Sequence, residues 1–128
     1  PKRFAAWFFI GAVQADSQVE VDGSEIVDHR WVCAAEALAQ RARKEIALPP
    51  PAYVSLLKLR EFSETAAIMS HVEERGVERF APRIVELDDG RCSLYAEDAG
   101  YASLDLNAPG PRHRLAMLKS GWDYVENY

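Results

Sequence analysis

The sequence predicts an α+β fold, in which a mixed sheet with helices is followed by C-terminal antiparallel hairpins. Three observations support this prediction: an early apolar run rich in aromatic residues, a middle part rich in helix formers, and two later segments that alternate around turn residues. The length of 128 residues fits one domain. We divide it into core strands and a helix over 1–48, a helical segment over 49–80 and a β-hairpin extension over 81–128.

The first part is expected to hold two strands and a helix. Residues 4–13 form a continuous apolar run, which predicts a strand buried on both faces with neighbours on either side. A turn signal at 21–24 precedes an alternating segment over 25–32, which predicts a second strand. Residues 34–44 are good helix formers, and the prolines at 49–51 must end that helix because proline lacks a backbone N–H.

The remaining elements are two helices and two hairpins. Residues 53–62 predict a packed helix, and the next helix is expected to start at an N-cap, Ser63, and to end at Gly76. The segment 83–95 predicts a hairpin around 88–90, because an Asp-Gly pair tolerates the positive φ of tight turns. A second hairpin is expected over 113–125, with its turn at Ser120 and Gly121.

Composition excludes several classes of protein. The net charge of −5 comes from 15 basic and 20 acidic residues, and the basic residues are scattered, which disfavours nucleic-acid binding. The longest apolar run has about ten residues, roughly half of what a membrane-spanning helix needs. Cys33 and Cys92 belong to no Cys/His cluster that would bind zinc, and two dispersed cysteines in an acidic chain indicate reduced thiols and a cytoplasmic location.

Most isolated charged residues have ordinary structural interpretations. We expect His29 to be half-buried in a sheet, and His71 and His113 to lie on the surface or in a hairpin. The pair at 97–98 predicts a solvated loop. The basic cluster at 112–114 could bind a phosphate, although a solvated strand end is the simpler interpretation.

The segment 73–77, EERGV, matches the tail of the catalytic box of Nudix hydrolases, whose glutamates hold a metal ion. Met69 and Ser70 stand where that box has an Arg-Glu pair, so this helix lacks a metal carboxylate. We interpret the match as accidental. A degenerate enzyme that uses Glu61, Glu73 and Glu74 is the least favoured hypothesis.

Other segments resemble the part of Nudix hydrolases that follows their box, in the bacterial branch related to peroxisomal coenzyme A diphosphatase. They are the segments at 3–10, 20–32, 35–38, 45–51 and 108–115. The resemblance implies a partial Nudix-like fold, the C-terminal portion of such an enzyme, with the box upstream of Pro1. The chain also begins without methionine inside an apolar segment, so we expect it to be a piece of a longer protein.

The resemblance implies hydrolysis of a nucleoside diphosphate linked to another moiety, such as a coenzyme A-like compound. The intact enzyme would use Mg²⁺ or Mn²⁺, and this chain alone would hold neither. Glu25, and after it Glu20, become candidates for a catalytic base or an extra metal ligand, although Glu25 equally fits an ordinary strand-edge carboxylate. Arg3 and Phe4 would lie at the substrate.

Two further expectations concern partners. A homodimer is expected, because the strand that begins at Phe4 would otherwise expose an edge. The alternative to an enzyme is a non-catalytic binding or assembly module that recognises a protein partner, and an exposed aromatic patch would favour it.

Overall fold

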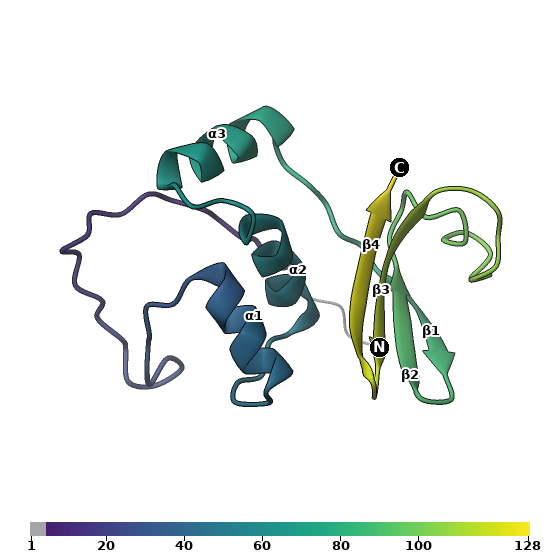
Figure 1. Ribbon diagram of the computed structural model, residues 1–128, viewed down its shortest axis with the longest axis horizontal. Helices are drawn as coiled ribbons and strands as arrows, with labels where there is room; N and C mark the ends of the chain where they lie inside the picture. Colours follow the sequence, from purple (N-terminus) through teal and green to yellow (C-terminus); the bar gives the residue numbers. More distant parts are fainter. Residues whose placement is uncertain (1–4) are drawn as a thin grey trace. The chain divides into compact units, whose positions relative to one another are not determined.

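The computed structural model describes residues 5–128, which divide into two compact units that meet in sequence between Val77 and Glu78 (Figure 1). All helices belong to the first unit and all strands to the second, so the α+β class is confirmed. The helices and the sheet form separate clusters of contacts, and the single domain expected from the length stays a prediction. No helix within residues 5–128 is long and apolar enough to cross a membrane.

Three helices follow one another in the first unit: α1 (Ala34–Ala42), α2 (Pro50–Leu59) and α3 (Thr65–Arg75). Each lies where the sequence predicted a helix. Pro50 and Pro51 occupy the first turn of α2, where the fixed φ of proline suits a helix and its missing N–H is not needed. Helix α1 packs against α2, with Ala37 and Val54 buried and the Arg41 guanidinium 4.8 Å from the centre of the Tyr53 ring.

The ends of α3 agree with the sequence in part. The N-cap is Glu64 rather than the predicted Ser63, and its side chain makes no capping hydrogen bond. Gly76 ends the helix with a φ of 66°, in the left-handed region that favours glycine.

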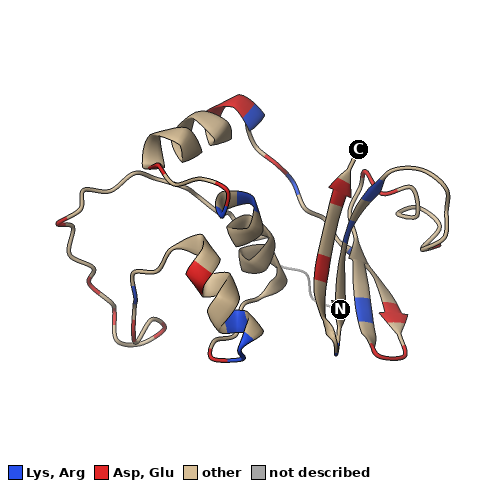
Figure 2. Ribbon diagram, viewed as in Figure 1, with Lys and Arg blue, Asp and Glu red and all other residues tan. Residues whose placement is uncertain are grey.

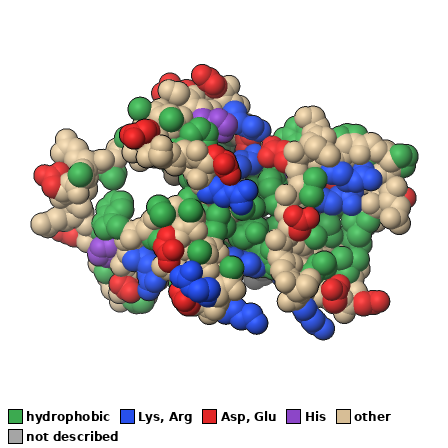
Figure 3. Space-filling view, in the orientation of Figure 1, with side chains coloured by type: hydrophobic (Ala, Val, Ile, Leu, Met, Phe, Trp, Pro, Cys, Tyr) green, Lys and Arg blue, Asp and Glu red, His purple; other side chains and the backbone are tan. Residues whose placement is uncertain are grey.

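The two strands predicted over 4–13 and 25–32 are not formed in residues 5–33, and Phe4 lies outside the described residues. The side chains of Trp7, Phe9 and Trp31 are 76%, 87% and 68% exposed. Figure 3 shows hydrophobic side chains along this extended segment at the left of the view. A strand buried on two faces needs paired neighbours, and no described strand pairs with this apolar run.

The second unit is one antiparallel sheet in the order β1-β2-β3-β4. Its strands are β1 (Arg83–Leu87), β2 (Gly90–Leu94), β3 (Arg112–Leu118) and β4 (Gly121–Asn127). Both predicted hairpins are present, and β2 pairs with β3 to join them. The antiparallel pairing of these C-terminal strands agrees with the sequence, since each connection returns the chain beside the preceding strand in the opposite direction. The mixed sheet that we expected before the hairpins is not formed by the described residues.

The first hairpin needs a glycine for a reason other than the predicted one. Gly90 is not among the residues with positive φ, and it lies inside β2. A Cβ at this position would collide with the carbonyl oxygen of Met117 on β3. Gly90 therefore permits close approach of two strands rather than a left-handed turn.

The loop between β2 and β3 is held against the sheet by polar contacts. Arg83 on β1 donates to the carbonyl oxygens of Tyr101 and Ala102, each at 2.7 Å. The Tyr101 hydroxyl donates to the carbonyl oxygen of Ala81 at 2.9 Å. Apart from these contacts, acidic and basic residues are scattered over the helices, the strands and the segments that connect them (Figure 2).

Candidate functional site

The predicted catalytic residue Glu25 follows a tight turn built on Asp22. One carboxylate oxygen of Asp22, Oδ1, accepts the backbone N–H groups of Ser24, Glu25 and Ile26 at 2.8, 3.0 and 3.0 Å. Gly23 has a φ of 71° and donates its N–H to the carbonyl oxygen of Ile26. The predicted turn is therefore present, and it fixes the backbone that carries Glu25.

The same hydrogen bonds act on the charge of Asp22. The N–H groups of Ser24 and Ile26 are the main reason that the pKa of this carboxyl lies below its ordinary value, since they stabilise the carboxylate. Asp22 is thus ionised when it holds the turn. The Glu25 side chain is exposed to solvent.

The other predicted site residues are not assembled with Glu25 in the described part of the chain. Glu20 is exposed in the same irregular segment, and no hydrogen bond or ion pair of residues 5–128 joins it to Glu25. Arg3 and Phe4 lie outside the described residues.

Residues 5–128 do not fit a magnesium or manganese site by themselves. They contain no group of three or more His, Cys, Asp or Glu side chains placed to hold a metal ion. Glu61, Glu73 and Glu74 are exposed, and Glu61 accepts a hydrogen bond from Arg60 at 2.8 Å.

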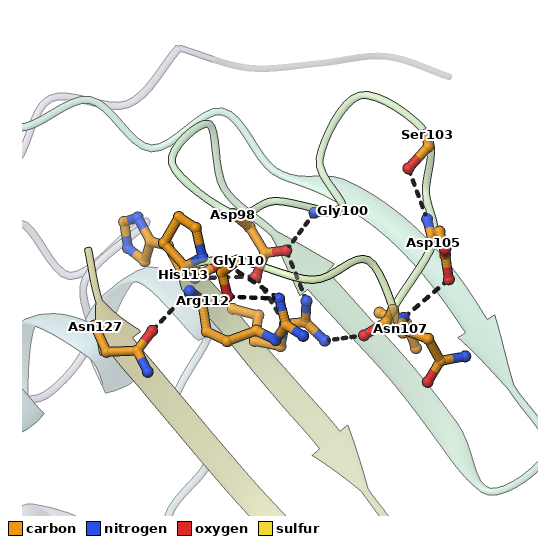
Figure 4. A network of polar contacts seen from close by, with 12 residues as sticks. Asp98, Gly100, Ser103, Asp105, Asn107, Gly110, Arg112, His113 and Asn127 are labelled. Carbon is orange, nitrogen blue, oxygen red and sulfur yellow. Dashed lines mark hydrogen bonds and ion pairs between the residues drawn. The ribbon is translucent and has the colours of Figure 1, made fainter.

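A polar centre that the sequence did not reveal lies in the second unit, around Asp98 (Figure 4). Arg114 donates from Nη2 to Oδ1 and from Nε to Oδ2 of Asp98, both at 2.7 Å. The backbone N–H groups of Gly100 and His113 donate to the same carboxylate at 2.8 and 2.9 Å. Asp98 is only 3% exposed, so the predicted solvated loop is wrong at this residue.

Burial opposes the ionisation of Asp98, but the hydrogen bonds from Arg114 and from the Gly100 and His113 backbones outweigh it. Together they hold the pKa of this carboxyl at about 2. Arg114 also donates to the carbonyl oxygen of Leu106 at 2.9 Å, so it closes the loop onto β3. The guanidinium of Arg114 is committed to these contacts, which corrects the interpretation of 112–114 as a solvated strand end.

His113 lies in the hairpin of β3 and β4, which is one of the two positions that the sequence suggested, but it is not on the surface, since only 3% of it is exposed. Its Nδ1 lies 2.6 Å from Glu97 Oε2, and its Nε2 lies 2.8 Å from the Tyr124 hydroxyl. Three aromatic rings surround the imidazole at centroid distances of 4.7 to 5.5 Å. They are those of Phe80, Tyr95 and Tyr128.

The pattern of β3 contains the signal that identifies His113 as buried. Side chains alternate across a strand, so His113 shares a face with Leu115 and Met117, and all three are buried. The partner Asp98 gives no comparable local signal, because it lies 16 residues from Arg114.

The other two histidines and the cysteines show no catalytic arrangement among the described residues. His29 is exposed rather than half-buried in a sheet, and the His71 ring packs on Phe62 at 4.8 Å. Cys33 is exposed, Cys92 is buried, and both are free thiols.

Comparison with known proteins gives a partial relationship. No protein-family profile and no solved structure matches the chain. It is 30% identical over 106 residues to "Acyl-coenzyme A diphosphatase NUDT19" of Xenopus laevis, and 30% identical over 103 residues to the protein of the same name from Homo sapiens. These alignments cover 76% and 78% of this chain but 28% of each relative. The chain is therefore similar, at low identity, to part of two acyl-coenzyme A diphosphatases, and it spans little more than a quarter of their length.

Proposed function

We propose that this chain is part of a Nudix-type hydrolase that cleaves a nucleoside diphosphate linked to another moiety, with a coenzyme A-like compound as substrate. The observation that supports the proposal is the 30% identity with two acyl-coenzyme A diphosphatases over 76% and 78% of the chain. The aligned part is 28% of each relative, so we assign to this chain a contribution to the enzyme rather than the whole of it.

The divalent metal of the proposed enzyme, Mg²⁺ or Mn²⁺, would be held by carboxylates other than those of residues 5–128. Those residues present no suitable cluster, and their exposed glutamates are dispersed. We therefore place the metal-binding segment in a part of the enzyme that corresponds to the unmatched length of the relatives.

The contribution that we assign to Glu25 is that of a general base. Its carboxylate is exposed, and its backbone is held by the Asp22 turn, so the side chain starts from a defined position and remains accessible to a water molecule. Glu20 is the second candidate for the same role. We further propose that Arg3 and Phe4, which lie outside the described residues, contact the substrate phosphate and the adjoining group.

The first test is the intact mass of the protein purified from its source, followed by an assay of the same sample. Coenzyme A and ADP-ribose would be incubated with it, with and without added Mg²⁺. We expect a mass above 14.4 kDa and metal-dependent formation of two phosphate-terminated products. A heavier sample that cleaves neither compound would overturn the proposed function, and a sample of 14.4 kDa that cleaves them would contradict our placement of the metal ligands.

The role of Glu25 has its own test in the active sample. We expect Glu25→Gln to lower kcat by roughly 10²- to 10⁴-fold, the usual contribution of a general base. Glu86→Gln is the matched control, because Glu86 is exposed on β1 in the second unit and should leave kcat unchanged. A full rate in Glu25→Gln and a large loss in Glu20→Gln would transfer the role to Glu20.

A non-catalytic binding or assembly module is the second candidate function. The exposed aromatic side chains of Trp7, Phe9 and Trp31 favour it, because large apolar side chains gathered in one segment are typical of contact surfaces. This function predicts that the protein captures a protein partner without added metal. Loss of capture in Trp7→Ser with no change in any hydrolytic activity would support it.

A homodimer and a cytoplasmic location complete the proposal. The same exposed apolar segment would be covered by a second copy, and the free thiols of Cys33 and Cys92 fit a reducing compartment. Sedimentation equilibrium should give twice the intact mass of the purified protein, and a monomer at all concentrations would contradict the dimer.

A further inference from the structure

Residues 27–32 of the first unit have the properties of a strand that lacks a neighbour. No backbone-to-backbone hydrogen bond of residues 5–128 involves them. The side chains of Val27 and Trp31 are 73% and 68% exposed. In an extended segment these two side chains share one face with His29, whereas Asp28 and Arg30 lie on the other.

The two charged side chains of this segment are both exposed and have opposite signs. Neither Asp28 nor Arg30 belongs to an ion pair within residues 5–128. Asp28 Oδ1 accepts only the N–H of the adjacent His29, at 2.8 Å, and Arg30 Nη1 donates to Gln40 Oε1 across 3.4 Å. Another strand that carries the complementary charges could therefore pair with both.

The segment is complementary to itself in one antiparallel register. When His29 faces His29 of a second copy, Asp28 faces Arg30 and Val27 faces Trp31. Each of these pairs occurs twice, because the arrangement has two-fold symmetry. Opposite charges, and an aromatic side chain opposite a β-branched one, stabilise antiparallel strands when they face each other directly.

The neighbouring registers are unfavourable. A shift of the symmetry axis by one residue places Asp28 against Asp28 of the second copy in one direction, and Arg30 against Arg30 in the other. Like charges that face each other directly destabilise a strand pair. The charge pattern therefore selects the register that is centred on His29.

The hydrogen bonds of the backbone fit the same register. Residues of an antiparallel pair alternate between those that bond the facing strand and those whose N–H and C=O groups point away from it. The N–H of His29 is donated to Asp28 Oδ1, which suits a residue that points away and leaves Asp28 and Arg30 to bond the second copy. The N–H of Ile26 is held by Asp22, so the pairing ends at the turn.

We propose that residues 26–32 pair with the same residues of a second copy, as an antiparallel two-stranded ribbon centred on His29. The inference rests on the homodimer proposed above and names the surface through which it forms. A two-stranded ribbon is only marginally stable by itself. The exposed side chains of Trp7, Phe8 and Phe9 supply apolar surface in both copies that can pack on the Trp31 face of the ribbon.

The register also affects the candidate base, a consequence that rests on the role proposed for Glu25. Glu25 faces Cys33 of the second copy at the end of the ribbon, within the turn built on Asp22. The second copy therefore lies beside this carboxylate and contributes to its surroundings. Glu20 precedes the turn and lies outside the ribbon, so dimerisation changes the surroundings of the two candidates differently.

The first test is disulfide crosslinking of the full chain, read by non-reducing electrophoresis and mass spectrometry. In the proposed register the Cα atoms of the two His29 residues lie about 4.5 Å apart, a distance that a disulfide can span. His29→Cys in a Cys33→Ser background should therefore form a covalent dimer under mild oxidation. Gln18→Cys in the same background is the matched control, because Gln18 is also exposed but lies outside the ribbon, so this variant should stay unlinked.

Charge reversal tests the register independently of any crosslink. Asp28→Arg and Arg30→Asp each place like charges against each other twice, so each should raise the dissociation constant of the dimer by about tenfold or more. The double variant restores both pairs with their signs exchanged, and its dissociation constant should return close to that of the unchanged protein. Sedimentation equilibrium measures these constants, and both side chains are exposed, so the variants should remain folded.

The outcomes separate the register from the dimer and from the enzyme. A dimer in which His29→Cys forms no crosslink, or in which Gln18→Cys crosslinks equally, overturns the register and leaves the homodimer in place. A double variant that dimerises as weakly as the single variants also overturns the register. A monomer at all concentrations overturns both. Hydrolysis enters none of these measurements, so failure of the proposed enzymatic activity would be seen separately.

Discussion

Asp98 and Arg114 are joined at two points, with Arg114 Nη2 and Nε each 2.7 Å from a different oxygen of the Asp98 carboxylate. One residue belongs to the loop after β2 and the other to β3, so this pair fastens the loop to the sheet. The Asp98 side chain is fully buried and that of Arg114 is 14% exposed. A bidentate pair stabilises one relative orientation of the loop and the strand, because its two hydrogen bonds fix the direction of both side chains in addition to pairing their charges.

Asp98→Asn should lower the free energy of unfolding of the second unit by about 3 to 5 kcal/mol, the usual cost of leaving one buried charge without its partner. Urea denaturation followed at the amide resonances of β3 measures this quantity. Glu61→Gln is the control, because it deletes one partner of the exposed Arg60–Glu61 pair and should change stability very little. Similar effects of the two variants would show that the buried pair contributes no more than a surface one.

The pH dependence of stability follows from the same carboxyl. The pKa of Asp98 falls from an ordinary value of 3.8 to about 2 in the folded protein. The folded state therefore gains stability, of about 2 kcal/mol, that is fully present above about pH 4 and is lost as the pH falls through about 2. Glu97, whose pKa is also lowered, acts in the same direction. Acid titration of the Asp98 carboxyl carbon by NMR checks the assignment, and a midpoint near 3.8 would contradict it.

Gly100→Ala should destabilise the second unit by about 1 to 3 kcal/mol, as overpacking of a closed site does. A Cβ at Gly100 would collide with the carbonyl oxygen of Asp105 and lie 3.2 Å from Asp98 Oδ1. Gly11→Ala is the matched control, since nothing lies within 4 Å of the Cβ that it would add. The measurement is the urea midpoint of each variant, and equal midpoints would show that the loop adapts to the extra atom.

The sequence predicts the helices and hairpins of this chain better than it predicts which segments pack against each other. Helices and hairpins follow from local signals, which are the prolines at the start of α2, Gly76 at the end of α3, and apolar-polar alternation on both sides of two turns. The apolar run at 4–13 is different, because it reports that a segment suits burial without identifying what covers it. Local pattern therefore assigned a strand for which the described residues provide no neighbour.

In the polar centre around Asp98 and His113, likewise, the burial of a residue follows from the local sequence, whereas its partners lie far away along the chain. The period of β3 places His113 with Leu115 and Met117, so its burial was open to prediction from alternation. Its partner Tyr124 and the Asp98–Arg114 pair depend on the register of strands and on the path of a loop. No spacing in the sequence encodes that register directly, which is why the charged residues at 97–98 and 112–114 looked solvated.

Asp22→Ala should loosen the segment that carries the candidate base. One carboxylate oxygen holds the N–H groups of Ser24, Glu25 and Ile26, so its removal should speed amide hydrogen exchange at these residues by about tenfold or more. Asp28→Ala is the control, because Asp28 Oδ1 accepts only the N–H of the adjacent His29 among the hydrogen bonds of residues 5–128. Unchanged exchange at Glu25 would mean that the turn persists without its carboxylate.

The two cysteines should react very differently with a thiol reagent. Cys33 is exposed, whereas Cys92 is 2% exposed on β2, and burial raises the pKa of its thiol. The reactive form of a cysteine is the thiolate, so Cys92 is protected in two ways: the reagent cannot reach it, and its thiol stays protonated. We expect mass spectrometry to find one label per native chain, at Cys33, and a second label only as the sheet unfolds in urea. Cys92 lies in the second unit, so its labelling reports the unfolding of that unit alone. In Asp98→Asn, we expect Cys92 to be labelled at lower urea concentrations than in the unchanged protein. Labelling of Cys92 without urea would show that the sheet opens without unfolding.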